Sequence, residues 1–160
     1  MAYRLVKALL VAGIALFFTL VVFNNLTDYE SNHQFVRHVL SMDTTFPGNR
    51  GMWRAIESPA IQTTFYWSII AWEALAMVLC WWGAIGLFTA PDAELFAAAR
   101  GTAIAGLTVG LLLWLVAFLG VGGEWFLMWQ SPTWNGQAAA FRMFAVEGIV
   151  LLILLAPAEP

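Results

Sequence analysis

Charged residues are scarce in this chain. Asp, Glu, Lys and Arg make up only 11% of its 160 residues, whereas hydrophobic residues make up 61%, and the mean hydropathy is +0.77. A soluble domain of this length could not bury so much apolar surface. The sequence therefore predicts an integral membrane protein, whose apolar surface contacts the lipid bilayer. The net charge of −3 and the lack of a basic run argue against nucleic acid as a partner.

The motifs of soluble enzyme chemistry are also missing. The sequence contains no Gly-rich phosphate loop, nucleophile elbow or HExxH pattern, and its one cysteine, Cys80, cannot form an intrachain disulfide. His33 and His38 are five residues apart, about 140° around a helix, so they do not share a face as a metal-binding pair would. We expect no enzyme activity, no cofactor and no metal site.

Four apolar runs dominate the chain instead. Each is long enough to cross the hydrocarbon core, which takes about 20 residues, and none alternates polar with apolar positions as a membrane strand would. The runs cover residues 5–23, 65–88, 102–121 and 138–156. They predict an all-α polytopic membrane protein, a single domain 1–160 with four transmembrane helices.

The orientation follows from the charges near the first run. Arg4 and Lys7 precede it, whereas Asp28 and Glu30 follow it. Cations favour the cytoplasmic side of a membrane. We expect both termini in the cytoplasm and the loop 24–62 in the periplasm.

The periplasmic loop has a helical pattern. Ser31 and Gln34 form a capping-box pattern, which favours a helix start at this point. An apolar stripe at helical spacing follows, formed by Phe35, Val36, Val39 and Leu40. The loop is thus expected to contain an interfacial helix. In the third apolar run, Thr102, Gly106 and Gly110 form a small-xxx-small ladder that favours close helix packing.

The two halves of the chain show an internal repeat. Met52-Trp53, Ser58-Pro59, Gln62 and Glu73 are matched in order by Met128-Trp129, Ser131-Pro132, Gln137 and Glu147. The match suggests a duplicated two-helix hairpin, although chance matching of common membrane residues remains an alternative. In a duplicated fold, the two glutamates would be equivalent.

Glu73 and Glu147 are the main candidate site residues. Each is expected near the bilayer midplane, where a charge costs roughly 2.5 to 3.5 kcal/mol. Both should therefore face inward, at similar depth. Arg142, on the same helix as Glu147, is expected to snorkel to the interface or bridge to a carboxylate. The pair is either a proton or cation site or a structural pair that fixes helix packing.

A family resemblance adds to this interpretation. The run from Phe35 to Phe46, then Trp53-Arg54-Ala55-Ile56, and Glu73 in the second apolar run resemble the bacterial family described as predicted small integral membrane protein, domain of unknown function 2165. The resemblance covers most of the chain. It implies four helices and a bacterial inner-membrane location, but no activity and no site residues.

Three functions fit these observations. The first is a non-catalytic accessory or packing subunit, which would contact other membrane subunits or form a homo-oligomer. The second is an oligomeric proton- or cation-coupled transporter or channel that uses Glu73 and Glu147. The third is a redox subunit that binds haem or quinone through the loop histidines.

Overall fold

The fold is built from helices of very different lengths. The computed structural model describes residues 2–157, which contain no strand. Four elements are long helices or helical segments: α1 (Ala2–Thr27), α3 (Pro59–Thr89), α4 (Ala93–Leu112) and α5 (Gln137–Leu155). The others are α2 (Tyr29–Ser41), the 3₁₀ helices η1 (Met52–Arg54) and η3 (Met128–Gln130), and the π-helix η2 (Leu113–Trp125), which continues α4 without a break.

Four helical segments are long and apolar enough to cross a membrane. They are Tyr3–Thr27, Pro59–Thr89, Ala93–Trp125 and Gln137–Leu155. The predicted fold class, an all-helical polytopic membrane protein, is confirmed.

Three of the four spanning helices extend beyond both ends of the apolar runs that predict them, whereas α5 matches its run within one residue. The third helix begins at Ala93 rather than near residue 102, because the Asp92 side chain caps its start by accepting a hydrogen bond from the Leu95 amide at 2.8 Å. It ends at Trp125, beyond the predicted residue 121, because the chain continues as a π-helix. Such a long π-helix is rare, and the hydrophobic pattern does not distinguish it from an α-helix.

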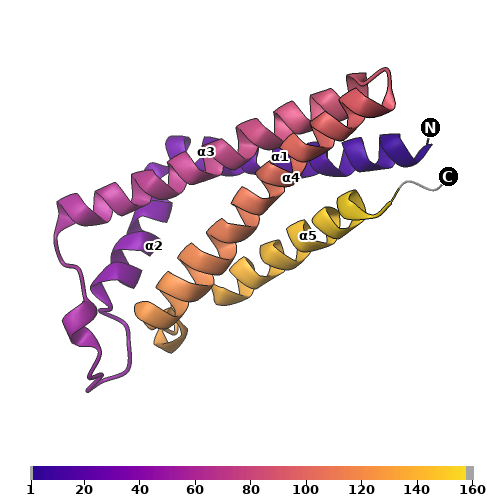
Figure 1. The fold of residues 1–160 in the computed structure, drawn as a ribbon. Helices are drawn as coiled ribbons and strands as arrows, with labels where there is room; N and C mark the ends of the chain where they lie inside the picture. Colours follow the sequence, from indigo (N-terminus) through magenta and orange to yellow (C-terminus); the bar gives the residue numbers. More distant parts are fainter. Residues whose placement is uncertain (1, 158–160) are drawn as a thin grey trace.

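The long helices pack in the order α1, α3, α4, α5. α3 lies along both α1 and α4, whereas α5 packs against α4 and η2 and also touches α1. Figure 1 shows both termini at one end of the molecule, with α2 and the loops that follow it at the opposite end. We call these the terminal end and the loop end.

A buried lysine ties the two termini together. Lys7 is only 1% exposed, and its Nζ donates hydrogen bonds to the carbonyls of Leu154 at 2.9 Å and Ala156 at 2.6 Å. The Tyr3 hydroxyl lies 2.6 Å from the Ala156 carbonyl as well. These carbonyls have no partner within α5, and a cation beside a helix C-terminus is favourable. Lys7 therefore fixes α1 against the end of α5.

Small residues allow α3 and α4 to approach closely. A Cβ added to Gly83 would lie 2.6 Å from the Ala103 backbone, and one added to Gly106 would lie 2.8 Å from the Cys80 nitrogen. Larger side chains at these glycines would thus force the helices apart. The tight contact explains why Cys80 and Ala103 are fully buried.

The loop helix lies where the apolar stripe predicts it. Val36, Val39 and Leu40 of α2 are buried, and they pack in a cluster with Tyr66 of α3 and Phe126. The capping-box prediction is wrong, because α2 begins at Tyr29. Ser31 lies inside its first turn and donates a hydrogen bond to the Asp28 side chain at 2.9 Å.

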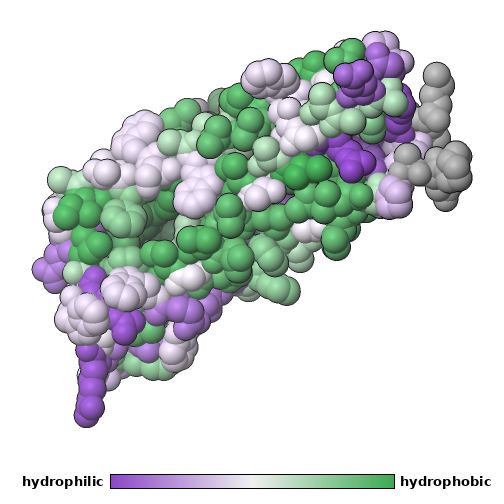
Figure 2. All heavy atoms as spheres, viewed as in Figure 1, coloured by the Kyte–Doolittle hydropathy of each residue, from purple (hydrophilic) through white to green (hydrophobic). Residues whose placement is uncertain are grey.

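The surface has an apolar middle and polar ends. In Figure 2, hydrophobic side chains cover the middle of the visible face, and hydrophilic ones gather at the terminal end and along the loop end. Exposed tryptophans lie on the loop-end segments at Trp53, Trp125 and Trp129. This distribution is typical of a membrane protein with an interfacial aromatic belt.

Candidate functional site

Glu147 is fully buried in the apolar interior. It lies in α5 and is 0% exposed. Its Oε1 accepts a hydrogen bond of 2.6 Å from the Trp114 indole nitrogen at the start of η2, but its Oε2 has no hydrogen-bond partner. Oε2 lies against Gly110 of α4, where a Cβ would overlap it. Only a glycine at position 110 leaves room for this carboxyl group.

Glu73 lies in a polar network at the loop end of α1. It is 3% exposed, and its Oε2 accepts a hydrogen bond of 2.6 Å from Asn25 Nδ2. Asn25 Oδ1 in turn accepts a hydrogen bond of 2.7 Å from Asn32 of α2. The Tyr66 hydroxyl donates to the Asn25 carbonyl at 3.2 Å. The second Glu73 oxygen, Oε1, accepts no hydrogen bond from the residues described.

The two glutamates lie at different depths, so the predicted equivalence in depth is wrong. Glu73 contacts Asn25 on α1, whereas Glu147 and Phe18 of α1 both lie against Gly110. Asn25 and Phe18 are seven residues apart, which is about 10 Å along a helix. Glu73 therefore lies toward the loop end and Glu147 nearer the middle of the protein. Hydropathy does not report this offset, because it depends on how the helices pack against one another.

A cavity of about 330 Å³ opens beside Glu73. Its walls come from α1, α2, α3, η2 and α5. The polar wall residues are Asn24, Asn25, Asn32, Tyr66 and Glu73, together with the Trp114 indole. Since Asn24 and Asn32 are exposed at the loop end, the cavity reaches the protein surface there.

Trp114 links the cavity to the second carboxyl group. It lines the cavity that contains Glu73, and its indole nitrogen donates to Glu147, which is not part of the cavity wall. The two glutamates thus share neither a hydrogen bond nor a cavity. Trp114 is the residue that connects them, since it lines the Glu73 cavity and donates a hydrogen bond to Glu147.

Arg142 does not join this site. It is exposed on α5 and forms no salt bridge with either glutamate in the part of the chain that the structure describes. Five residues separate it from Glu147, so the two side chains point about 140° apart around the helix. The bridging alternative is therefore not what the structure shows. The exposed position is the one that a snorkelling arginine would take.

The predicted packing ladder is split between two environments. Gly106 and Gly110 are buried, against Cys80 and Glu147 respectively. Thr102, one turn earlier, is only partly buried and lines a separate surface groove with Trp82 and Gly86 of α3.

The family is established by the sequence of nearly the whole chain. Residues 3–157 match the family described as predicted small integral membrane protein (DUF2165). The chain belongs to this family. It is an integral membrane protein, and the family description assigns no activity. Searches of curated proteins and of solved structures found no match.

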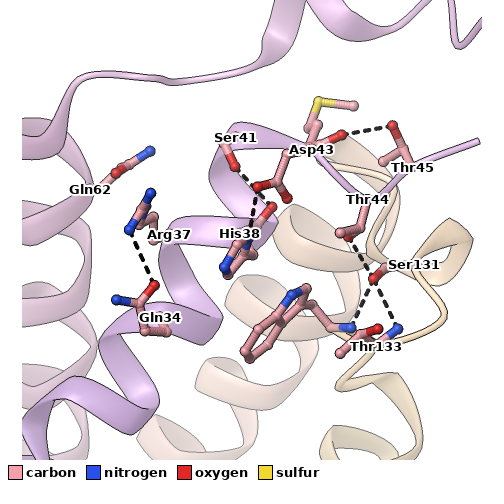
Figure 3. Close-up of polar contacts among 12 residues, drawn as sticks. Gln34, Arg37, His38, Ser41, Asp43, Thr44, Thr45, Gln62, Ser131 and Thr133 are labelled. Atoms are coloured by element: carbon pink, nitrogen blue, oxygen red, sulfur yellow. Dashed lines mark hydrogen bonds and ion pairs between the residues drawn. The ribbon is translucent and has the colours of Figure 1, made fainter. Parts of the chain in front are cut away.

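A second polar cluster joins α2 to the loop after η3 in this member of the family. Figure 3 shows His38 and Asp43 side by side, with Ser131 on the facing loop. His38 Nδ1 lies 2.7 Å from Asp43 Oδ2, and the His38 ring stacks on Trp134 at 4.6 Å. Ser131 Oγ lies 2.7 Å from the Thr44 hydroxyl and accepts from the Trp134 amide at 2.8 Å.

This cluster contains a Ser, a His and an Asp, the residue types of a catalytic triad, but its Ser is not hydrogen-bonded to its His. No hydrogen bond joins His38 to Ser131 among the residues described, because the Ser131 hydroxyl is engaged by the Thr44 hydroxyl and by the amides of Thr133 and Trp134. A triad nucleophile must bond to its base. The cluster is therefore built to hold α2 against the second loop.

The histidines do not form a metal site with their neighbours. His33 packs against Tyr29 and Tyr66, whereas His38 stacks on Trp134. Residues 2–157 contain no group of three or more His, Cys, Asp or Glu placed to hold a metal ion. The haem or quinone hypothesis gains no support from this placement.

The repeated sequence elements take similar local structures. Met52-Trp53 and Met128-Trp129 each begin a 3₁₀ helix that is followed by an extended residue, Ala55 or Ser131. Each glutamate also accepts a hydrogen bond from the transmembrane helix that precedes its own. These parallels agree with the hypothesis of a duplicated hairpin, but the donors differ, since one is Asn25 and the other Trp114.

Four side chains form buried hydrogen bonds that the sequence does not predict. The apolar run ends at residue 23 and so predicts a loop position for Asn25, although α1 continues through it. Trp114 and Tyr66 read as ordinary aromatic residues of a membrane helix, and nothing in the local sequence marks them as hydrogen-bond donors. In the sequence, Lys7 indicates only the orientation of the first helix. Its depth depends on where α5 ends, which is a tertiary property.

Proposed function

We propose that this protein is a non-enzymatic cation transporter of the bacterial inner membrane, with Glu73 as its cation-binding residue. One observation supports the proposal most directly. The Glu73 carboxyl group lines a cavity that reaches the surface, and no Lys, Arg or His is among the residues that line it. A carboxylate in such a place needs a positive partner, because an unpaired charge at membrane depth is expensive.

Glu147 is a second acidic residue, deeper in the protein than Glu73. It lies further from the loop end than Glu73, against Gly110, and accepts a hydrogen bond from Trp114. Its unpartnered Oε2 is an acceptor that a proton or cation would satisfy. In this proposal, rotation of Trp114 opens the way from the cavity to Glu147, and Glu147 is required for translocation rather than for first binding.

Binding and transport can be tested separately. In nanodiscs, we expect tetramethylammonium to quench or shift tryptophan fluorescence saturably, because Trp114 lines the cavity. Glu73→Gln should lower the affinity at least tenfold while keeping a hydrogen bond to Asn25. Glu94→Gln, an exposed change at the terminal end, is the matched control.

Transport is measured as uptake of the same ion into proteoliposomes. Glu147→Gln should bind the ion as the wild type does but transport it at least tenfold more slowly. Binding that survives Glu73→Gln unchanged would refute the proposal, and binding without any uptake would leave a cation-binding protein that does not transport.

The accessory-subunit function remains a second candidate, because a surface groove favours it. The groove between α3 and α4 at the terminal end has a volume of about 310 Å³ and is lined by small residues such as Gly86, Ala98 and Ala99. Small residues let transmembrane helices approach closely. The proposed occupant is a transmembrane helix of a partner subunit.

Copurification tests this second function. After extraction in a mild detergent, a specific partner chain should copurify with the wild type, as identified by mass spectrometry. Ala98→Leu should reduce its yield, because the side chain would fill the groove. Val146→Leu, on the exposed surface of α5, is the control. A partner retained at full yield by Ala98→Leu would show that this groove is not its docking site.

A further inference from the structure

A second cavity lies next to the one that contains Glu73. It has a volume of about 200 Å³ and lies between α3 and η2, with α2 behind it. Ser68 is its only polar lining side chain apart from the Trp72 indole, and that indole nitrogen already donates to the Val109 carbonyl at 2.9 Å. Figure 2 shows a hollow between α3 and the lower part of the α4–η2 helix in this region.

This second cavity faces the lipid. Phe65 and Ser68 of α3 and Val116 of η2 are on its rim, and all three are exposed. They belong to segments that are long and apolar enough to span the membrane. The surroundings of the rim are therefore acyl chains rather than water, and an apolar group can enter from the bilayer.

Only a thin wall separates the two cavities. Phe35, Val36, Ile69 and Phe118 line both of them. Phe35 and Phe118 stack with their ring centroids 6.5 Å apart, and each is only partly buried. A rotation of either ring would join the apolar cavity to the polar one.

Together, the two cavities have a lining that suits an amphiphile with a positively charged head group. The polar cavity offers one carboxylate, amide oxygens and aromatic faces from Tyr66, Trp114 and Phe118, which attract an ammonium group. No basic side chain lines either cavity, so nothing there would balance the charge of an anionic head. The apolar cavity matches a hydrocarbon chain.

We propose that the ligand of this protein is an amphiphilic organic cation, with its ammonium head beside Glu73 and its apolar chain in the cavity between α3 and η2. The inference rests on the proposed function, because it identifies the class of cation that the same site binds. Phe35 and Phe118 form the gate through which the chain connects the two cavities. The ligand reaches the site from the lipid through the rim at Val116.

The test compares one amphiphile with its two halves. Dodecyltrimethylammonium carries both features, tetramethylammonium is the head alone, and dodecanol is the chain alone. Radiolabelled probes are bound to the full protein in zwitterionic nanodiscs, and binding to empty nanodiscs is subtracted. We expect dodecyltrimethylammonium to bind saturably and at least tenfold more tightly than tetramethylammonium, whereas dodecanol should show no saturable binding.

Two variants block the lipid-facing cavity. Val116→Trp fills it from η2 and Ser68→Trp fills it from α3, and both positions are exposed at the rim, so the fold should tolerate the change. Each should lower the affinity for dodecyltrimethylammonium at least tenfold and leave that for tetramethylammonium unchanged. Val146→Trp, on an exposed part of α5 outside both cavities, should change neither.

The outcomes separate this inference from the proposed function. If Glu73→Gln lowers binding of both cations but both rim variants bind the amphiphile as the wild type does, the lipid-side route is refuted and cation binding at Glu73 stands. Equal affinities for the two cations in the wild type would also refute the inference. If Glu73→Gln leaves both affinities unchanged, the inference and the proposed function fail together.

Discussion

At the scale of single residues, one carboxyl group deep in the protein is incompletely satisfied. Glu147 has one bonded oxygen and one unpartnered oxygen, and Gly110 provides the space for the second. The same glycine contacts the Phe18 ring, so helices α1, α4 and α5 meet at this point. Any side chain at position 110 must displace either the carboxyl group or the ring.

The first prediction concerns this contact. Gly110→Ala should lower the free energy of unfolding by roughly 1 to 3 kcal/mol, because the added methyl overlaps Glu147 Oε2 and lies 2.8 Å from Phe18 Cζ. Denaturant unfolding in detergent micelles measures the effect.

Gly101→Ala, in the same helix, is the matched control for this prediction. Its methyl would meet nothing within 4 Å, so it should be neutral or stabilise the protein by about 0.5 to 1 kcal/mol. Equal unfolding free energies for the two variants would show that the close contact at position 110 does not exist.

At the scale of elements, α2 connects the loop end to the transmembrane helices. One face contributes Val36, Val39 and Leu40 to the cluster around Tyr66 and Phe126, and the other contains exposed residues such as Arg37. α2 also supplies Asn32 to the Asn25–Glu73 network. Its position therefore controls one wall of the polar cavity.

The second prediction is that α2 is a stable helix in the membrane-embedded protein. Amides of residues 36–40 should exchange with solvent at least a hundredfold more slowly than those of residues 46–50, because they form helical hydrogen bonds on a buried face. Hydrogen exchange read by mass spectrometry in nanodiscs provides the measurement. Exchange of residues 36–40 as fast as that of the 46–50 loop would exclude an ordered α2.

At the scale of the whole molecule, the arrangement is polarised. Both termini and the α3–α4 connection lie at one end, and the polar cavity, α2 and the aromatic belt lie toward the other. Arg4 and Lys7 are at the terminal end. The polar cavity beside Glu73 thus lies toward the loop end, which the charge pattern predicts to be periplasmic.

The third prediction tests that orientation. In a Cys80→Ala background, which removes the one native thiol, Arg50→Cys should react with a membrane-impermeant maleimide in intact bacterial cells. Glu94→Cys, at the terminal end, should react only after the cells are permeabilised. Both positions are exposed, so whether the maleimide reaches each thiol depends only on the side of the membrane on which it lies. Labelling of Glu94→Cys in intact cells with protection of Arg50→Cys would reverse the orientation.

Most of the helices could be predicted from the sequence. Apolar runs of about 20 residues identify all four spanning helices, because the bilayer requires that length. The stripe from Phe35 to Leu40 identifies α2, because its spacing places the four side chains on one helical face. The predicted boundaries of the third helix are wrong, because the Asp92 cap starts it earlier and a π-helix extends it at the other end.

Composition and hydropathy are enough to predict the membrane environment of this protein, its helical class and the two carboxyl groups within its spanning segments. The surroundings of those groups depend on how the helices pack. Glu73 faces a cavity beside Asn25, whereas Glu147 lies further from the loop end and accepts a hydrogen bond from Trp114. The reason is physical: hydropathy reports how much of a helix is apolar, but the offset between neighbouring helices depends on side-chain packing, such as that of Gly83 on Ala103 and Gly106 on Cys80.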